Sequence, residues 1–153
     1  MKLAEALMER KAIKNKMEEL KKRIYQNAQV QEGDMPIENP THLLQELSEE
    51  VKKFEELVIR INNTNMTAKL SGEDGLTLME AIVKKDMLNY AHLIYINLAD
   101  KATPVNARYS NREIKSIPSI EISDIRKKAD DIAKEYRMLD SKIQEANWNT
   151  ELV

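Results

Sequence analysis

The chain has 153 residues, 33% charged and 42% hydrophobic, with 3 glycines and 4 prolines, which is typical of one mainly helical domain rather than a β-sandwich or disordered tail. A formal net charge of −2 excludes a strong overall field that would draw the chain onto DNA, RNA or an anionic membrane. The lack of cysteine excludes disulfides and thiolate chemistry and fits the cytosol.

The N-terminal stretch is not expected to be a signal peptide, because Glu5, Glu9 and Arg10 interrupt any apolar core. No run of about 18 apolar residues occurs, so we expect no transmembrane helix. These features predict a cytoplasmic protein of bacterial type.

A first helix is predicted over about residues 2–28, where apolar positions recur in alternating steps of three and four, the spacing of a coiled coil. Its predicted inner stripe is Leu3, Ala6, Arg10, Ile13, Met17, Leu20, Ile24 and Asn27. The outer positions are mostly basic. A connector with one glycine and two prolines follows.

A second helix is predicted over about 41–66, with Thr41 as its N-cap. Its predicted stripe is Leu44, Leu47, Val51, Phe54, Val58, Ile61 and Asn65. The flank of this helix is acidic and complements the basic first helix, so we expect the two to form an antiparallel hairpin.

A third helix is predicted over about 77–99, opened by a capping box of Thr77 and Glu80. It is apolar nearly all round: Leu78, Met79, Ile82, Val83, Met87, Leu88, Ala91, Leu93, Ile94, Ile96 and Leu98. A helix of this kind is buried on several sides. We therefore expect a homo-oligomer, most simply a dimer, that forms through this helix.

The fourth helix is predicted over about 121–147, with the stripe Ile122, Ile125, Ala129, Ile132, Tyr136, Leu139, Ile143 and Ala146. Together these elements predict an all-α fold: a single domain over 1–153, built as an antiparallel, coiled-coil-like bundle of four long helices. A small two-stranded β element from residues 67–71 and 112–117 is a further hypothesis.

Several kinds of catalytic or ligand site are not expected. A di-metal bundle needs Glu-x-x-His, but the residues three before His42 and His92 are both Asn. His92 is better explained as a core or interface histidine. Adjacent acids such as Glu49/Glu50 point about 100° apart on a helix and are interpreted as solvated. No phosphate-binding glycine loop occurs. We expect no catalytic residue, cofactor or metal.

The connector "ARYSNREIKSI", residues 107–117, together with the sole tryptophan, carries the candidate partner-contact or lid residues: Arg108, Tyr109, Arg112, Glu113, Lys115 and Trp148. Two interpretations stay open. The segment closes the end of the bundle, or it is a docking point for a partner. Basic residues of the first helix could contact a nucleic-acid backbone, but the acidic second helix makes pairing within the protein the simpler interpretation.

Five fragments in order, "MKLAEAL", "NAQVQEGD", "INNTN", "RYSNREIK" and "IQEANWNTEL", resemble a family of small bacterial helical proteins labelled septicolysin-like. The resemblance spans nearly the whole chain. It implies a cytolysin but transfers no catalytic motif. Two functions follow: a non-enzymatic cytoplasmic interaction or assembly protein with a possible protein partner, or the membrane-active protein that the label implies.

Overall fold

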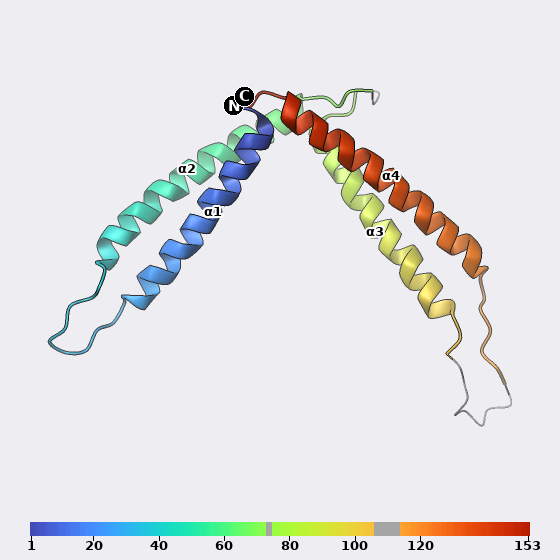
Figure 1. The fold of residues 1–153 in the computed structure, drawn as a ribbon, viewed down its shortest axis with the longest axis horizontal. Helices are drawn as coiled ribbons and strands as arrows, with labels where there is room; N and C mark the ends of the chain where they lie inside the picture. The colour runs from blue at the N-terminus through green and yellow to red at the C-terminus, as the bar shows by residue number, and fades with distance from the viewer. Residues whose placement is uncertain (73–74, 106–113) are drawn as a thin grey trace. The chain divides into compact units, whose positions relative to one another are not determined.

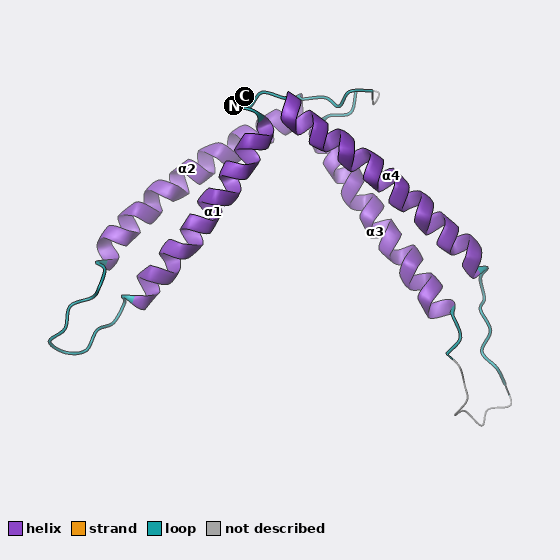
Figure 2. Ribbon diagram, viewed as in Figure 1, coloured by secondary structure: helices purple, strands orange, loops and turns teal. Residues whose placement is uncertain are grey.

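A computed structural model describes residues 1–72, 75–105 and 114–153. It contains four long helices: α1 (Leu3–Gln26), α2 (Pro40–Thr67), α3 (Leu78–Ala102) and α4 (Ile122–Asn149). Connectors make up most of the remainder (Figure 2). The prediction of an all-α fold, a bundle of four long helices, is confirmed, with the helices packed as pairs within each unit, and each helix lies within a few residues of its predicted bounds.

The chain divides into two compact units. The first contains Met1–Lys69 with Gln144–Val153, and the second contains Leu70–Ile143. The boundary falls inside α4, so the last residues of that helix belong to the first unit. That residues 1–153 act as a single domain stays a prediction.

In the first unit, α1 and α2 lie side by side as an antiparallel pair (Figure 1). The predicted stripe of α1 is confirmed, because Leu3, Ala6, Ile13 and Leu20 are buried and its other members are at least partly covered. Burying an aliphatic side chain of this size stabilises the fold by about 1.5–3 kcal/mol. This stripe is therefore a major contribution of α1 to the packing energy of the pair.

The stripe of α2 was only half right. Leu47, Phe54 and Ile61 face inward as predicted, but the other inward positions lie one residue earlier than expected. These positions are Leu43, Glu50, Leu57 and Thr64, all buried. The shift leaves Leu44 and Val51 exposed at 52% and 42%. A hydrophobic pattern predicts that a glutamate such as Glu50 is exposed. Glu50 can instead be buried because Lys16 and Lys53 pair with its carboxylate.

Both chain ends lie together in the first unit (Figure 1). The Leu3 amide donates to the Thr150 carbonyl (2.9 Å), and the Leu152 amide donates to the Met1 carbonyl (2.9 Å). The Glu151 carboxylate accepts from the N-terminal ammonium (3.3 Å) and pairs with Lys2 (2.5 Å). We call residues 1–3 and 150–153 the terminal clasp.

In the second unit, α3 and α4 run antiparallel (Figure 1). Two ion pairs join α3 to α4 at different points along their length, Lys85 with Asp140 (3.0 Å) and Arg126 with Asp100 (3.2 Å). The predicted capping box of α3 is confirmed: the Glu80 amide donates to Thr77 Oγ1 (3.2 Å), and the Thr77 amide donates to Glu80 (2.8 Å). The predicted stripe of α4 is confirmed as well, since all its members are buried or half-buried.

Two local predictions need correction. The N-cap of α2 is Asn39 rather than Thr41, because Asn39 Oδ1 accepts from the Thr41 amide (2.9 Å) and Pro40 takes the first helical position. The second correction concerns the suggested strand pairing of residues 67–71 with 112–117. Of the latter segment the structure describes residues 114–117, and these form no strand. The Leu70 amide already donates to the Leu76 carbonyl (2.9 Å) within its own connector.

Candidate functional site

The structure describes two of the six predicted partner-contact or lid residues. Lys115 is exposed in the connector before α4, and Trp148 is 54% exposed on the last turn of that helix. Lys115 belongs to the second unit and Trp148 to the first. The other four lie outside the described residues: Arg108, Tyr109, Arg112 and Glu113.

The two histidines lie on different helices and in different surroundings. His42 is exposed on α2. His92 is half-buried on α3, one to two turns beyond Lys85 on the covered side of that helix, as expected of a histidine in a helix interface. Within residues 1–72, 75–105 and 114–153, no group of three or more potential ligand side chains could hold a metal ion.

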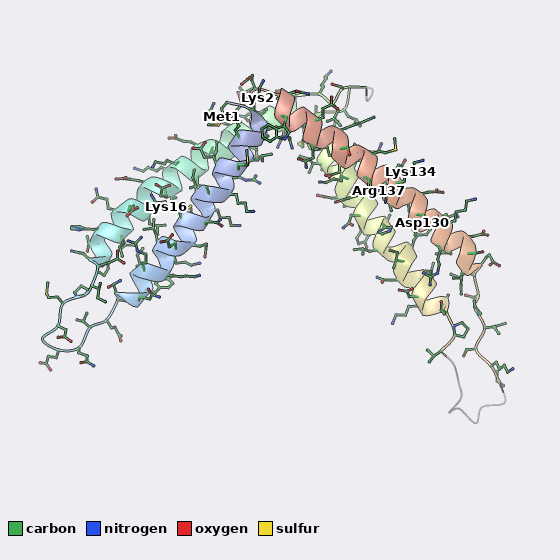
Figure 3. All side chains as sticks on the ribbon, in the orientation of Figure 1. Met1, Lys2, Lys16, Asp130, Lys134 and Arg137 are labelled. Carbon is green, nitrogen blue, oxygen red and sulfur yellow. The ribbon has the colours of Figure 1, made fainter. Side chains whose placement is uncertain are left out.

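The most buried charged side chain is Glu50, which corrects the interpretation of Glu49/Glu50 as a solvated pair. The Glu50 side chain is 7% exposed, and its Oε1 accepts from Lys16 of α1 (3.0 Å) and Lys53 of α2 (3.0 Å). Lys16 also pairs with Glu46 (3.2 Å); Figure 3 labels its place on α1. Hydrogen bonds, first from Lys53 and then from Lys16, hold the pKa of the Glu50 carboxyl below its usual range, although burial opposes them. This cluster joins α1 to α2.

A second charged group sits between α3 and α4. Lys85 is 20% exposed; it donates to Asp140, and its ammonium lies 5.9 Å from the centre of the Tyr136 ring. The hydrogen bond to Asp140 raises the pKa of Lys85, while burial acts in the opposite direction. Lys85 occupies a position where a helix pair normally places an apolar residue, so its charge is satisfied by the partner helix.

A hollow of about 400 Å³ runs along α4, lined by Asp131, Ile132, Lys134, Glu135 and Met138. Figure 3 shows Lys134 on this helix, with Asp130 and Arg137 along the same stretch. All five lining residues come from neighbouring turns of one helix. Side chains so arranged do not converge on a substrate from opposite sides, as a catalytic pair requires.

The feature that stands out chemically is the outer face of α3. Its pairing with α4 buries mainly small or terminal positions, with Leu78, Ala81 and Ala99 inside. Seven large apolar side chains remain between 41% and 64% exposed: Met79, Val83, Met87, Tyr90, Leu93, Ile94 and Leu98. We call these seven the outer face of α3. Sequence reasoning anticipated an unusually apolar helix but did not single out Tyr90.

The sequence matches the model of a family of unknown function, DUF6847, over residues 10–152. The chain belongs to this family. The match covers all four helices of the DUF6847 chain except the start of α1. No curated protein matches the sequence.

A crystal structure of a functionally unknown conserved protein from Corynebacterium diphtheriae is similar to this DUF6847 chain. The two are 44% identical, with a TM-score of 0.91, and the alignment covers 100% of this chain and 99% of the other. Two independent observations, family and structure, therefore place the protein among relatives whose role is open.

The resemblance to septicolysin-like proteins was wrong. The family model that matches nearly the whole sequence is DUF6847, and nothing found here connects it with a cytolysin. The fragments behind the resemblance are short and lie mostly in connectors and at the termini, where a few shared residues carry little information. The membrane-active alternative rested on the septicolysin-like resemblance, so it is no longer supported. Among the described residues, none of the helices is long and apolar enough to cross a membrane.

Proposed function

We propose that the protein is a non-enzymatic assembly protein of the cytoplasm, which associates with a second copy of itself through α3. The observation that carries this proposal is the outer face of α3, where seven large apolar side chains are left exposed by the pairing with α4. Contiguous exposed apolar surface marks interaction sites in proteins. The cysteine-free sequence fits a reducing compartment.

The placement of the charged residues supports a non-enzymatic role. Catalytic acids and bases are expected in a cleft, with a pKa shifted by burial and by neighbouring charges. Here Glu50 and Lys85, whose pKa values are shifted, each bridge two helices within one pair. The ion pairs that join the helices therefore account for both pKa shifts, without a catalytic role.

The cations of α1 support the same proposal over nucleic-acid binding. Lys16 is engaged with Glu46 and Glu50, and Arg23 donates to Glu38 in the connector before α2 (Nε to Oε2, 3.0 Å). A surface that follows a phosphate backbone needs its cations free to replace counterions. Pairing within the protein is the role we assign to these two residues.

The experiment is light scattering coupled to size exclusion at micromolar concentration, on the unaltered chain and on Ile94→Asp. We expect a dimer for the former. For the latter we expect at least about a 10-fold rise in the dissociation constant, because a carboxylate would be buried in an apolar contact. Ile59→Asp on α2 is the matched control, since Ile59 is 52% exposed and Ile94 49%. It should leave the dimer intact.

Two results would contradict the proposal. One is a strict monomer at every concentration of the unaltered chain. The other is a dimer that Ile94→Asp and Ile59→Asp weaken equally, because assembly would then not depend on α3. Circular dichroism of both variants verifies that helix content is retained, so a change in mass reports association.

A further inference from the structure

The outer face of α3 has a near-palindromic arrangement. Met79, Val83 and Met87 are spaced four residues apart, and so are Tyr90, Ile94 and Leu98. A step of three residues separates the two sets. Counted from the two ends, the first residue matches the last, the second the fifth, and the third the fourth. At about 100° per residue, all seven members of the face fall within an arc of roughly 140°.

A palindrome of this kind fits a two-fold contact between identical helices. In an isologous interface the same patch meets itself, so each residue is matched by its mirror position in the other copy. An antiparallel pair has the property that facing residues have numbers adding to nearly the same value. Lys85 with Asp140, and Asp100 with Arg126, already show this between α3 and α4.

We infer that α3 pairs antiparallel with α3 of a second copy, about a two-fold axis between Leu88 and Asn89. This inference rests on the proposed function and names its partner and geometry. In this register Met79 lies opposite Leu98 of the second copy, and Val83 opposite Ile94. Near the axis Met87 lies opposite Tyr90, a sulfur–aromatic contact that occurs twice by symmetry.

The available surface comes close to what such a dimer needs. Taken as wholly buried, the exposed parts of the seven residues come to at most roughly 700 Å² per copy, against about 800 Å² per partner in a stable protein–protein interface. The contact extends from Met79 to Leu98, about 28 Å at 1.5 Å per residue. A lone helix–helix contact of this length and composition falls at the lower end of stable interfaces.

Charge favours the antiparallel register over a parallel one. Asp86 lies on the exposed side of α3, between Val83 and Tyr90 along the same face. A parallel pairing in register would put the two Asp86 carboxylates opposite each other in a partly dehydrated contact, where like charges repel strongly. The antiparallel register puts Asp86 opposite Ala91 and separates the two carboxylates by about 8 Å along the axis.

Disulfide trapping tests the register without background, because the chain has no cysteine. Val83→Cys and Ile94→Cys chains are mixed, exposed to mild oxidation and separated without reductant. We expect a linked dimer in the mixture, at several times the yield from either variant oxidised separately. A second pair, Met87→Cys with Tyr90→Cys, should behave in the same way, and circular dichroism checks that all four variants remain helical.

Each remaining outcome overturns the inference in a distinct way. If Val83→Cys links to itself more readily than to Ile94→Cys, the helices are parallel, and equal yields would show that no single register exists. If neither mixture links while light scattering reports a dimer, the copies meet through another surface; self-assembly then stands, but its assignment to α3 fails. If the unaltered chain is monomeric, the inference and the proposed function both fail.

Discussion

The two helix pairs use similar lengths of helix but distribute their apolar side chains differently. In α1 and α2, large side chains such as Leu20, Leu57 and Ile61 are almost fully buried. In α3, the buried residues within the helix are Leu78 and two alanines, while larger residues such as Tyr90 stay exposed. Large side chains are thus buried on both helices of the first pair, whereas α3 keeps much of its apolar surface exposed.

The charged residues reinforce this difference. The first pair buries Glu50 between two lysines and ties the chain ends to α2, where Val153 and Thr64 share a hydrogen bond. The second pair places Lys85 at an inward position, where its ammonium pairs with Asp140 of the other helix (3.0 Å). The second unit thus leaves large apolar side chains of α3 exposed, and these are the side chains on which the proposed association rests.

The largest expected effect is a difference between two leucines. Leu20→Ala removes a side chain that is 0% exposed and should lower the free energy of unfolding by about 2–5 kcal/mol. Leu93→Ala removes one that is 49% exposed and should cost no more than about 0.5–1 kcal/mol in dilute, monomeric protein. Urea unfolding followed by circular dichroism measures both. Equal losses would show that the outer face of α3 is packed as a core, and the comparison would fail.

Glu50→Gln should be next in size. It keeps the shape of the side chain but deprives Lys16 and Lys53 of their shared carboxylate, at an expected cost of about 1–3 kcal/mol. Since the folded pKa of Glu50 lies below the unfolded value near 4.5, its contribution is complete above pH 4.5. That contribution is lost as pH falls through the folded pKa.

The measurement for Glu50 is urea unfolding between pH 7 and pH 3. The difference in unfolding free energy between the unaltered chain and Glu50→Gln should shrink as the pH falls below about 4.5. Glu49→Gln, at the exposed neighbouring position, is the matched control. A difference that is constant over the whole range would mean that the Glu50 charge does not hold α1 to α2.

A smaller effect is expected at Thr64, which is 1% exposed. Its hydroxyl donates to the Arg60 carbonyl (2.8 Å) and accepts from the Val153 amide (3.0 Å). Thr64→Val removes both bonds and should cost about 1–2 kcal/mol. Thr67→Val, at an exposed hydroxyl three residues later, is the control and should change little. Hydrogen exchange at the Val153 amide should become faster only in Thr64→Val. An unchanged exchange rate in that variant would mean that Thr64 does not stabilise the terminal clasp.

Lys85→Met should have the smallest effect, below about 1 kcal/mol. Methionine keeps an apolar stem between α3 and α4, and the partner carboxylate of Asp140 is 37% exposed and can be hydrated. Because the pKa of Lys85 is raised above its usual 10.5, the charge on Lys85 contributes fully at pH 7, and this contribution is lost as pH rises through the folded pKa. Thermal unfolding at pH 7 measures the change. A loss as large as that of Glu50→Gln would contradict the contrast between the two pairs.

Most of the fold could be predicted because helix periodicity is a local signal. All members of the α1 and α4 stripes predicted from steps of three and four are at least partly covered, although buried Ala4 and Asn147 were missed, and Thr77 with Glu80 marked the start of α3. The α2 stripe was misplaced at alternate positions, since hydrophobic periodicity cannot show that Glu50 is neutralised by Lys16, 34 residues away in sequence.

The candidate site was less accessible to sequence reasoning. That α3 is unusually apolar was visible, but which of its sides α4 covers depends on tertiary contacts such as that between Lys85 and Asp140. The residues of the connector 107–117 were chosen for their charge and aromatic character. Four of the six candidates lie outside the described residues, so their role as partner contacts or as a lid stays a prediction.

The terminal clasp has a consequence for the order in which the protein forms. It joins groups up to 150 positions apart, and the first unit consists of two stretches of chain with the whole second unit inserted between them. During synthesis α1 and α2 leave the ribosome early, yet their unit lacks residues 144–153 until the inserted unit has been made. We therefore expect the inserted unit to fold before the unit that encloses it is complete, with the most non-local contacts closing last.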